Sequence, residues 1–225
     1  MDSKKLYIIL SVVIFSLAVT FIDAFVHPPY FSKIPIKILF FLVLPMLFFA
    51  FHREEWGKCR ALFRFERRGI LLSLLLGGGI FLLIFGGFLL TRGVIDYSGV
   101  TESLTSGMGI TRENLLAVAL YMSVMNSFLE EFFFRGFGFI TLKHYTSARF
   151  AYLFSPLFFA IYHTGMLVGM FHPAVILLLM AGLFAGGLIF NALNDRFGNL
   201  YPSWLAHMGA GFAINAVGFV LFGMM

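Results

Sequence analysis

Three ionisable residues lie close together inside an otherwise apolar part of the sequence. Glu130, Glu131 and Arg135 fall within the run FLEEFFFRG at residues 128–136. Residues four apart lie on one face of a helix, so Glu131 and Arg135 can form a pair. Glu130 points about 100° away from Glu131 and has no partner in its own helix. A buried carboxyl group of this kind can exchange protons, which is the chemistry of a general acid or base.

A histidine on the next predicted helix is the candidate partner of Glu130. His163 closes the motif Phe159-x-x-x-His163. Counted from the flanking Lys143 and Arg149, at 1.5 Å per residue, Glu130 lies about 20 Å deep and His163 about 21 Å deep. Two adjacent antiparallel helices would therefore bring these two side chains to the same level.

A second histidine and an asparagine follow on the last predicted helix. His207, Gly211 and Asn215 are spaced by four residues and share one helix face. The same count places His207 about 9 Å deep and Asn215 about 20 Å deep. We therefore expect Asn215 to lie nearer than His207 to the level of Glu130. We expect Asn126, one turn before Glu130, to form a hydrogen bond between helices.

The chain that carries these polar residues has the composition of a membrane protein. It is 60% hydrophobic and 12% charged, whereas a soluble domain carries about 25% charged residues. We expect an all-α, polytopic transmembrane bundle of about seven helices, with eight as the upper count, because each span needs about 20 apolar residues. The predicted spans are 6–26, 35–51, 70–91, 113–142, 148–164, 173–193 and 202–223.

The chain is expected to form one integral membrane domain over residues 1–225, with N-terminal helices to about residue 92 and a core at about 113–223. We expect the first helix to remain uncleaved, since no small-x-small site follows it. Lysine and arginine are concentrated in segments on the same side as the N-terminus, which favours a cytoplasmic N-terminus. Because these residues flank apolar spans, the net charge of +5 does not indicate nucleic acid binding.

Small residues and cysteine add two further expectations. Gly182 and Gly186 form a small-x-x-x-small pair, which predicts a close approach of two helices. Cys59 is the only cysteine, which excludes a disulfide within one chain and a cysteine-based metal site.

The order of these motifs resembles the CPBP family of intramembrane proteases. The resemblance rests on the pattern Glu130-Glu131-x-x-x-Arg135, on the phenylalanine–histidine motif that ends at His163, and on His207 in a final helix. The family includes the type II CAAX prenyl endopeptidases and bacteriocin-processing and self-immunity proteins. The resemblance covers roughly residues 113–215, and the first three spans match only in being apolar.

The resemblance implies a membrane-embedded endopeptidase with a glutamic mechanism. It implies that Glu130 is the catalytic glutamate and that His163 helps it to activate a water molecule. His207 would stabilise the oxyanion. The supporting residues would be Glu131, Arg135, Phe159 and Asn215. In the family, an asparagine often follows the oxyanion-stabilising histidine by four residues. This chain has Gly211 at that position, four residues after His207, and Asn215 is expected to substitute for the asparagine.

A metal-dependent mechanism is the first alternative. One glutamate and two histidines are also a ligand set for catalytic zinc. However, the sequence has no His-x-x-x-His pair, and the resemblance implies that Glu130 acts as a base. We therefore expect no metal and no other cofactor.

Two further functions remain open. The first, which Gly211 favours, is that of a family member of reduced activity that serves as a membrane binding or immunity protein. Intramembrane Glu, Arg and His residues also mark proton relays, but a proton-coupled transporter usually has repeated halves, and the sequence shows none. The expected partners are the lipid bilayer and a membrane-anchored or lipidated peptide or protein. The expected location is the plasma (inner) membrane of a prokaryote, in multi-pass form.

Overall fold

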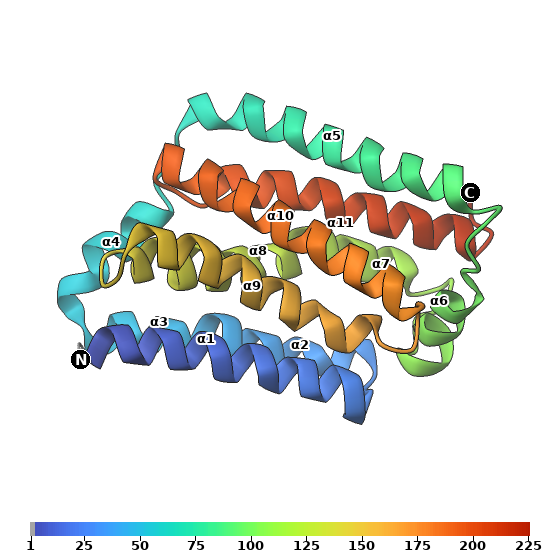
Figure 1. The fold of residues 1–225 in the computed structure, drawn as a ribbon, viewed down its shortest axis with the longest axis horizontal. Helices are drawn as coiled ribbons and strands as arrows, with labels where there is room; N and C mark the ends of the chain where they lie inside the picture. Colours follow the sequence, from blue (N-terminus) through green and yellow to red (C-terminus); the bar gives the residue numbers. More distant parts are fainter. Residues whose placement is uncertain (1–2) are drawn as a thin grey trace.

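The computed structural model describes residues 3–225, which form a bundle of roughly parallel and antiparallel helices without strands (Figure 1). Seven helical segments are long and apolar enough to cross a membrane, so the predicted all-α polytopic fold is confirmed. The segments are Ser3–Val26, Tyr30–Phe51, Arg67–Thr91, Leu115–Thr141, Ala148–Leu167, Pro173–Phe197 and Tyr201–Leu221.

Three of these spans are built from consecutive helical pieces, and the others are single α-helices. The first span is α1 (Ser3–Phe21) with η1 (Ile22–Val26), and the second is α2 (Tyr30–Ile38), η2 (Leu39–Val43) and α3 (Leu44–Phe51). The fourth is α7 (Leu115–Leu120), η5 (Tyr121–Asn126), α8 (Ser127–Glu130) and η6 (Glu131–Thr141). The remaining spans are α5 (Arg67–Thr91), α9 (Ala148–Leu167), α10 (Pro173–Phe197) and α11 (Tyr201–Leu221).

Short helices connect the spans outside the apolar region. The second and third spans are joined by η3 (Arg53–Glu55) and α4 (Trp56–Leu62), and the third and fourth by α6 (Ser98–Glu102) and η4 (Ser103–Gly107). The two ends of the chain lie at opposite ends of the bundle (Figure 1), as an odd number of spans requires.

The fourth span is the centre of the bundle and the most buried of the seven. Its η6 part is buried on nearly every side and packs against the first two spans, α9 and α10. Apart from the Glu131–Arg135 pair its long side chains are apolar, and a helix of this kind is stable when it is surrounded by other elements. The phenylalanine run that the sequence shows is therefore the inner core, and its fully buried members are Phe132, Phe133, Phe134, Phe137 and Phe139.

The fourth span is also wound more widely than an ordinary α-helix. Both η5 and η6 have π-helical hydrogen bonding, in which each amide reaches back five residues. The Thr141 hydroxyl donates to the carbonyl oxygen of Gly136 at 2.8 Å, which is the same five-residue step. Wide turns of this kind occur frequently at functional sites, and Glu130 lies between the two.

The second part of the turn between α10 and α11, at Asn199 and Leu200, is buried in the bundle, whereas Gly198 is exposed. The Leu200 amide donates to the carbonyl oxygen of Leu62 at 2.9 Å, and Asn199 and Leu200 are almost inaccessible to solvent. The Leu62 and Leu200 side chains also lie against Gly136 of the central span. The last span therefore begins inside the protein and not at its surface.

The predicted close approach at Gly182 and Gly186 is wrong, because a Cβ atom at either position would meet open space. The tight glycine contacts lie elsewhere. A Cβ atom at Gly209 of α11 would overlap the carbonyl oxygen of Gly77 of α5, and one at Gly187 would meet Pro156. Spacing alone could not identify these sites, because a small-x-x-x-small pattern does not say which helix face has a neighbour.

Candidate active site

One carboxylate oxygen of Glu130 is held by donors from three different spans. Its Oε1 atom accepts from Asn126 Nδ2 at 2.7 Å and from the Tyr162 hydroxyl at 2.9 Å. Lys37 Nζ lies 3.8 Å from the same oxygen and donates to Asn126 Oδ1 at 3.0 Å. The Glu130 side chain is only 2% exposed. Oε1 is thereby fixed, which leaves the second oxygen to face elsewhere.

The second oxygen of Glu130 faces two histidines. Oε2 lies 3.8 Å from His163 Nε2 and 3.7 Å from His207 Nε2. Both distances are longer than a direct hydrogen bond. They are short enough for one small polar molecule to bridge Glu130 Oε2 and a histidine Nε2 atom. We call Glu130, His163 and His207 the Glu130 cluster.

The other ring nitrogen of each histidine has a fixed acceptor. His163 Nδ1 lies 2.7 Å from the carbonyl oxygen of Phe159, which can only accept, so this nitrogen carries the proton. His207 Nδ1 lies 2.8 Å from Glu131 Oε1, and the same reasoning applies. In a neutral imidazole the Nε2 atom then has a free lone pair. Both free positions are directed to Glu130.

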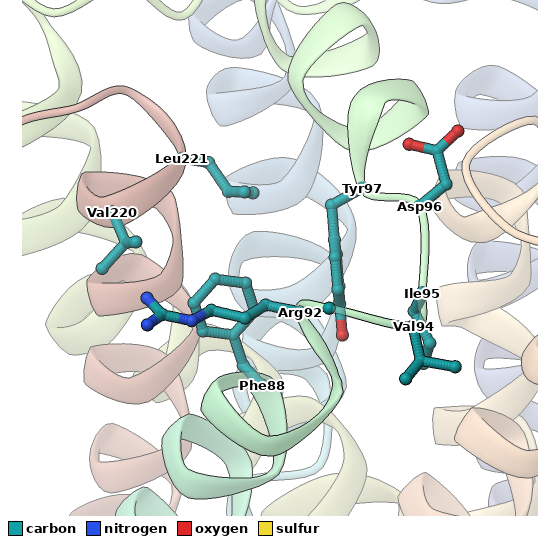
Figure 2. Close-up of a pocket in the computed structure, with 9 residues that line it drawn as sticks. Phe88, Arg92, Val94, Ile95, Asp96, Tyr97, Val220 and Leu221 are labelled. Atoms are coloured by element: carbon teal, nitrogen blue, oxygen red, sulfur yellow. The ribbon is translucent and has the colours of Figure 1, made fainter.

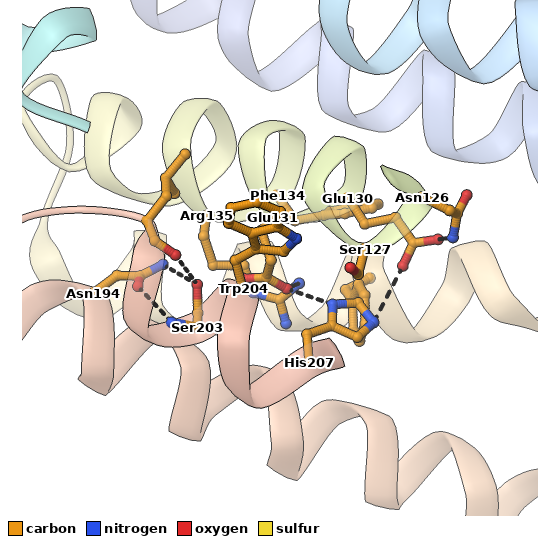
Figure 3. Close-up of polar contacts among 12 residues, drawn as sticks. Asn126, Ser127, Glu130, Glu131, Phe134, Arg135, Asn194, Ser203, Trp204 and His207 are labelled. Carbon is orange, nitrogen blue, oxygen red and sulfur yellow. Dashed lines mark hydrogen bonds and ion pairs between the residues drawn. The ribbon is translucent and has the colours of Figure 1, made fainter. Parts of the chain in front are cut away.

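Glu131 and Arg135 form the ion pair that their spacing predicts. Arg135 Nη1 lies 3.2 Å from Glu131 Oε1, and both side chains are fully buried. Figure 3 shows Glu131 between Arg135 and His207, with a contact to each. Glu131 therefore links the central span to the last span and is more than a partner of Arg135.

Phe159 occupies the centre of this arrangement. Its ring lies 4.0 Å from the Arg135 guanidinium carbon and 4.6 Å from the His163 ring centre. It also packs edge-on against His207 at 5.7 Å. A ring face beneath a desolvated guanidinium is a favourable cation–π contact. Phe159 thus supports the histidines and the arginine at once.

Asn215 is not brought to the Glu130 cluster. Its Nδ2 atom donates to the Gly211 carbonyl oxygen at 2.8 Å and to Ser123 Oγ at 3.2 Å. These bonds tie α11 to η5 and occupy the amide donor. Gly211 itself is a packing site, because a Cβ atom there would lie 2.9 Å from the Cα atom of Ser123.

The depth counted for His207 is wrong, whereas the level match of Glu130 and His163 agrees with their 3.8 Å contact. The count assumed that the last span begins at the membrane surface. Because Leu200 is buried beside Gly136, His207 lies deeper than its distance from the turn indicates, and it reaches Glu130.

Sequence reasoning missed two members of the site. Neither Lys37 nor Tyr162 was predicted to contact Glu130. A signal existed for Lys37, since it is followed directly by a long apolar run within its span. Asn126 was expected to link helices, and it does so by joining Lys37 to Glu130.

The residues present fit a metal ion poorly. In the described part of the chain, no three His, Cys, Asp or Glu side chains are arranged to hold one. The Lys37 ammonium group, 3.8 Å from Glu130, would also repel a divalent cation bound to this carboxylate.

A separate hollow lies at the C-terminal end of α5, between Phe88, Arg92, Tyr97 and Val220 (Figure 2), and its volume is about 500 Å³. It is open and shares no residue with the Glu130 cluster. The candidate active site is therefore the Glu130 cluster, because its carboxylate and two imidazoles can transfer protons.

The fold and the cluster together define a multi-pass membrane protein with a carboxylate and two histidines enclosed between its helices. Residues 112–213 match the family model of the Rce1-like type II CAAX prenyl endopeptidases. This match supports membership of the CPBP and CAAX protease family and confirms the resemblance, over a segment that contains Glu130, His163 and His207. Neither the curated proteins nor the solved structures contain a match to the chain.

Proposed function

We propose that this protein is an intramembrane endopeptidase that cleaves the tail of a membrane-associated peptide or protein, with or without a lipid on that tail, by means of a water molecule activated by Glu130 and His163. The match of residues 112–213 to the family model supports a CAAX-type intramembrane protease at family level. The observation that carries the proposal is the position of Glu130 Oε2, which faces the Nε2 atoms of both histidines while Oε1 is held by other donors.

In the proposed first step, a water molecule between the two side chains donates one hydrogen to Glu130 Oε2 and the other to His163 Nε2. Glu130 takes the first proton as the O–H bond breaks. The hydroxide oxygen forms a bond to the carbonyl carbon of the scissile peptide. The proton then passes from Glu130 to the leaving nitrogen as the C–N bond breaks, so no covalent enzyme intermediate is needed.

His207 is proposed to stabilise the oxyanion. In this role His207 acts as the imidazolium: its Nδ1–H group donates to Glu131, 2.8 Å away, and its Nε2–H group donates to the developing negative charge. Donors of this kind typically contribute about 3–4 kcal/mol to the transition state. Asn215 is committed to Gly211 and Ser123, so we propose that His207 performs this role without the expected asparagine.

The whole chain is proposed to act as one integral membrane domain with its N-terminus in the cytoplasm of a prokaryotic cell. The exposed arginines of the connection around α4 support this orientation, because basic residues accumulate on the cytoplasmic side. They lie near the end of the bundle where the chain begins (Figure 1), and they are Arg53, Arg60, Arg64, Arg67 and Arg68.

The test is cleavage of a peptide panel by purified protein in lipid nanodiscs. The panel contains prenylated tails, the same tails without the lipid, and transmembrane peptides. We expect Glu130→Gln and His163→Ala to lower the rate by about 10²- to 10⁴-fold, the usual contribution of a positioned base. Matched controls are Glu113→Gln and His144→Ala, whose side chains are exposed and lie outside the cluster.

Each outcome has a definite meaning once circular dichroism shows that the variants are folded. Cleavage by the wild type that both cluster variants lose, and both controls keep, supports the proposal. Full activity of Glu130→Gln contradicts it. A wild-type protein that binds the lipidated peptides without cleaving them would favour a binding or immunity protein, and Gly211 is the feature that favours this second candidate.

A further inference from the structure

Two lysines of α2 point into the bundle. Lys33 lies 2.6 Å from Asp23 of η1, and both side chains are less than a tenth exposed. This buried pair joins the first two spans. Lys37 follows one turn later on the same face. Its side chain is 14% exposed, and its polar contacts are with the fourth span.

Lys37 determines how the Asn126 amide is oriented. An ammonium group has only donors, so the Asn126 atom at 3.0 Å from it must be the carbonyl oxygen. The amide nitrogen of Asn126 is then directed to Glu130, at 2.7 Å. Without Lys37 the buried Asn126 oxygen would lose its donor, and the amide would be held only by its bond to Glu130.

Lys37 also acts on Glu130 directly. The 3.8 Å between Lys37 Nζ and Glu130 Oε1 is a distance at which opposite charges attract strongly inside a protein. Tyr162 closes the arrangement, because its hydroxyl donates to Oε1 at 2.9 Å and its ring lies 5.2 Å from the Lys37 ammonium group. The other oxygen of Glu130 faces the two histidines.

We propose that Lys37 is a positioning residue for Glu130, acting through Asn126 to hold Oε1 so that Oε2 faces His163 and His207. The proposal rests on the proposed function, because it assigns a purpose to the orientation of the Glu130 carboxylate. Lys37 lies outside residues 112–213, the segment that matches the family model. The N-terminal spans therefore contribute to the site as well as to packing.

The first test compares Lys37→Met with Lys37→Arg in the full-length protein. We expect Lys37→Met to lower kcat by about 10- to 100-fold, the effect typical of groups that orient a functional ligand, with little change in KM. Lys37→Arg keeps the positive charge and the donors, so it is expected to recover most of the rate. A fall in kcat that arginine does not relieve would overturn the proposal.

The second readout does not require cleavage. The infrared difference between wild type and Glu130→Gln gives the carboxylate band of Glu130. We expect this band to shift in Lys37→Met and to return in Lys37→Arg. An unchanged band in Lys37→Met would overturn the positioning role even if cleavage fell. A shifted band in a protein that cleaves nothing would support the positioning of Glu130 and contradict only the protease proposal.

Three further variants separate the role of Lys37 from a general packing effect. Asp23→Asn with Lys33→Met removes the neighbouring buried pair without touching Glu130, and we expect the Glu130 band to be unchanged. Asn126→Leu is expected to shift the band in the same direction as Lys37→Met, and the double variant Lys37→Met/Asn126→Leu to shift it by less than the sum of the two single shifts. Additive shifts would show that Lys37 does not act through Asn126.

Discussion

His207 Nδ1 lies 2.8 Å from Glu131 Oε1, and this contact joins the last span to the central span. The same carboxylate oxygen is 3.2 Å from Arg135 Nη1. Glu131 is therefore shared between a fully buried cation and a histidine that faces Glu130. The charge of Glu131 holds the site together without facing the scissile bond.

Removal of the Glu131 charge is expected to destabilise the protein. Glu131→Gln leaves Arg135 buried beside a neutral amide, and breaking a buried pair in this way costs about 3–5 kcal/mol. Denaturation in detergent measures the loss. The double variant Glu131→Gln/Arg135→Met should be more stable than Glu131→Gln alone, since no buried charge is left unpaired. A double variant that is the less stable of the two would contradict this account of the pair.

Two neighbouring glycines of α10 should respond differently to alanine. At Gly187 the added Cβ atom would lie 2.7 Å from Pro156 Cβ and 3.1 Å from Arg135 Nη2. Gly187→Ala is therefore expected to cost about 1–3 kcal/mol, as overpacking does. Gly186→Ala points into open space and should be neutral or slightly stabilising. Equal thermal stability of the two variants would show that α10 can move away from α9 at little cost.

An asparagine at position 211 should not improve the enzyme. The Cβ atom of Gly211→Asn would lie 2.9 Å from Ser123 Cα, and backbone cannot yield as a flexible side chain does. We expect α11 to be displaced from η5 at a cost of about 1–3 kcal/mol, with a lower cleavage rate. Gly218→Ala on the same helix is the control, because its Cβ atom would make an ordinary 3.8 Å contact. A faster Gly211→Asn variant would contradict the prediction.

Acid should weaken the protein through Glu55, which lies outside the membrane-spanning segments. Burial acts to raise the pKa of Glu55, but hydrogen bonds with Lys58, Tyr145 and Lys4 prevail and lower it to about 2. A lowered pKa means that Glu55 contributes stability above its unfolded value of about 4.3. This contribution is lost as the pH falls from there toward about 2.

The measurement for Glu55 is the melting temperature of wild type and Glu55→Gln between neutral and acid pH. The wild type is expected to be the more stable at neutral pH, and the difference should shrink in acid. Lys4 and Lys58, which lie 2.9 Å and 2.7 Å from the Glu55 carboxylate, remain charged throughout. A difference that is independent of pH would show that Glu55 acts by packing alone.

Strong chelation should leave cleavage unchanged. The two imidazole Nε2 atoms and Glu130 Oε2 are already part of a network that includes the nearby Lys37 cation. Proteolysis assays with and without a zinc chelator, on protein analysed for bound metal, test this prediction. Stoichiometric zinc that is required for activity would replace the base mechanism with metal-assisted hydrolysis.

The parts of the site that were predictable are those governed by local helix geometry. The four-residue spacing gave the Glu131–Arg135 pair, and counting along two adjacent helices placed Glu130 level with His163. Composition was enough to predict seven spans, because the cost of exposing so much apolar surface to water leaves no other fold.

The remaining parts depend on tertiary packing that no local pattern encodes. His207 was placed too shallow because the turn before α11 is buried against Leu62. Asn215 was expected near Glu130, yet Gly211 brings α11 so close to Ser123 that the asparagine bonds there instead. Lys37 was not predicted to reach the site, since a lysine near the end of a span usually extends toward the interface. Here Asn126 and Glu130 give it partners inside the bundle.

The buried turn before α11 has a consequence for mapping the topology of the chain. Thiol-labelling experiments assign a loop to one side of the bilayer when a water-soluble reagent reaches a cysteine placed in it. Asn199 is 2% exposed and Leu200 is 3% exposed, so cysteines at these positions would resist such a reagent from either side. A survey that placed cysteines only at these two positions would miss the reversal of the chain, whereas the neighbouring Asp195, Arg196 and Gly198 are exposed and would react.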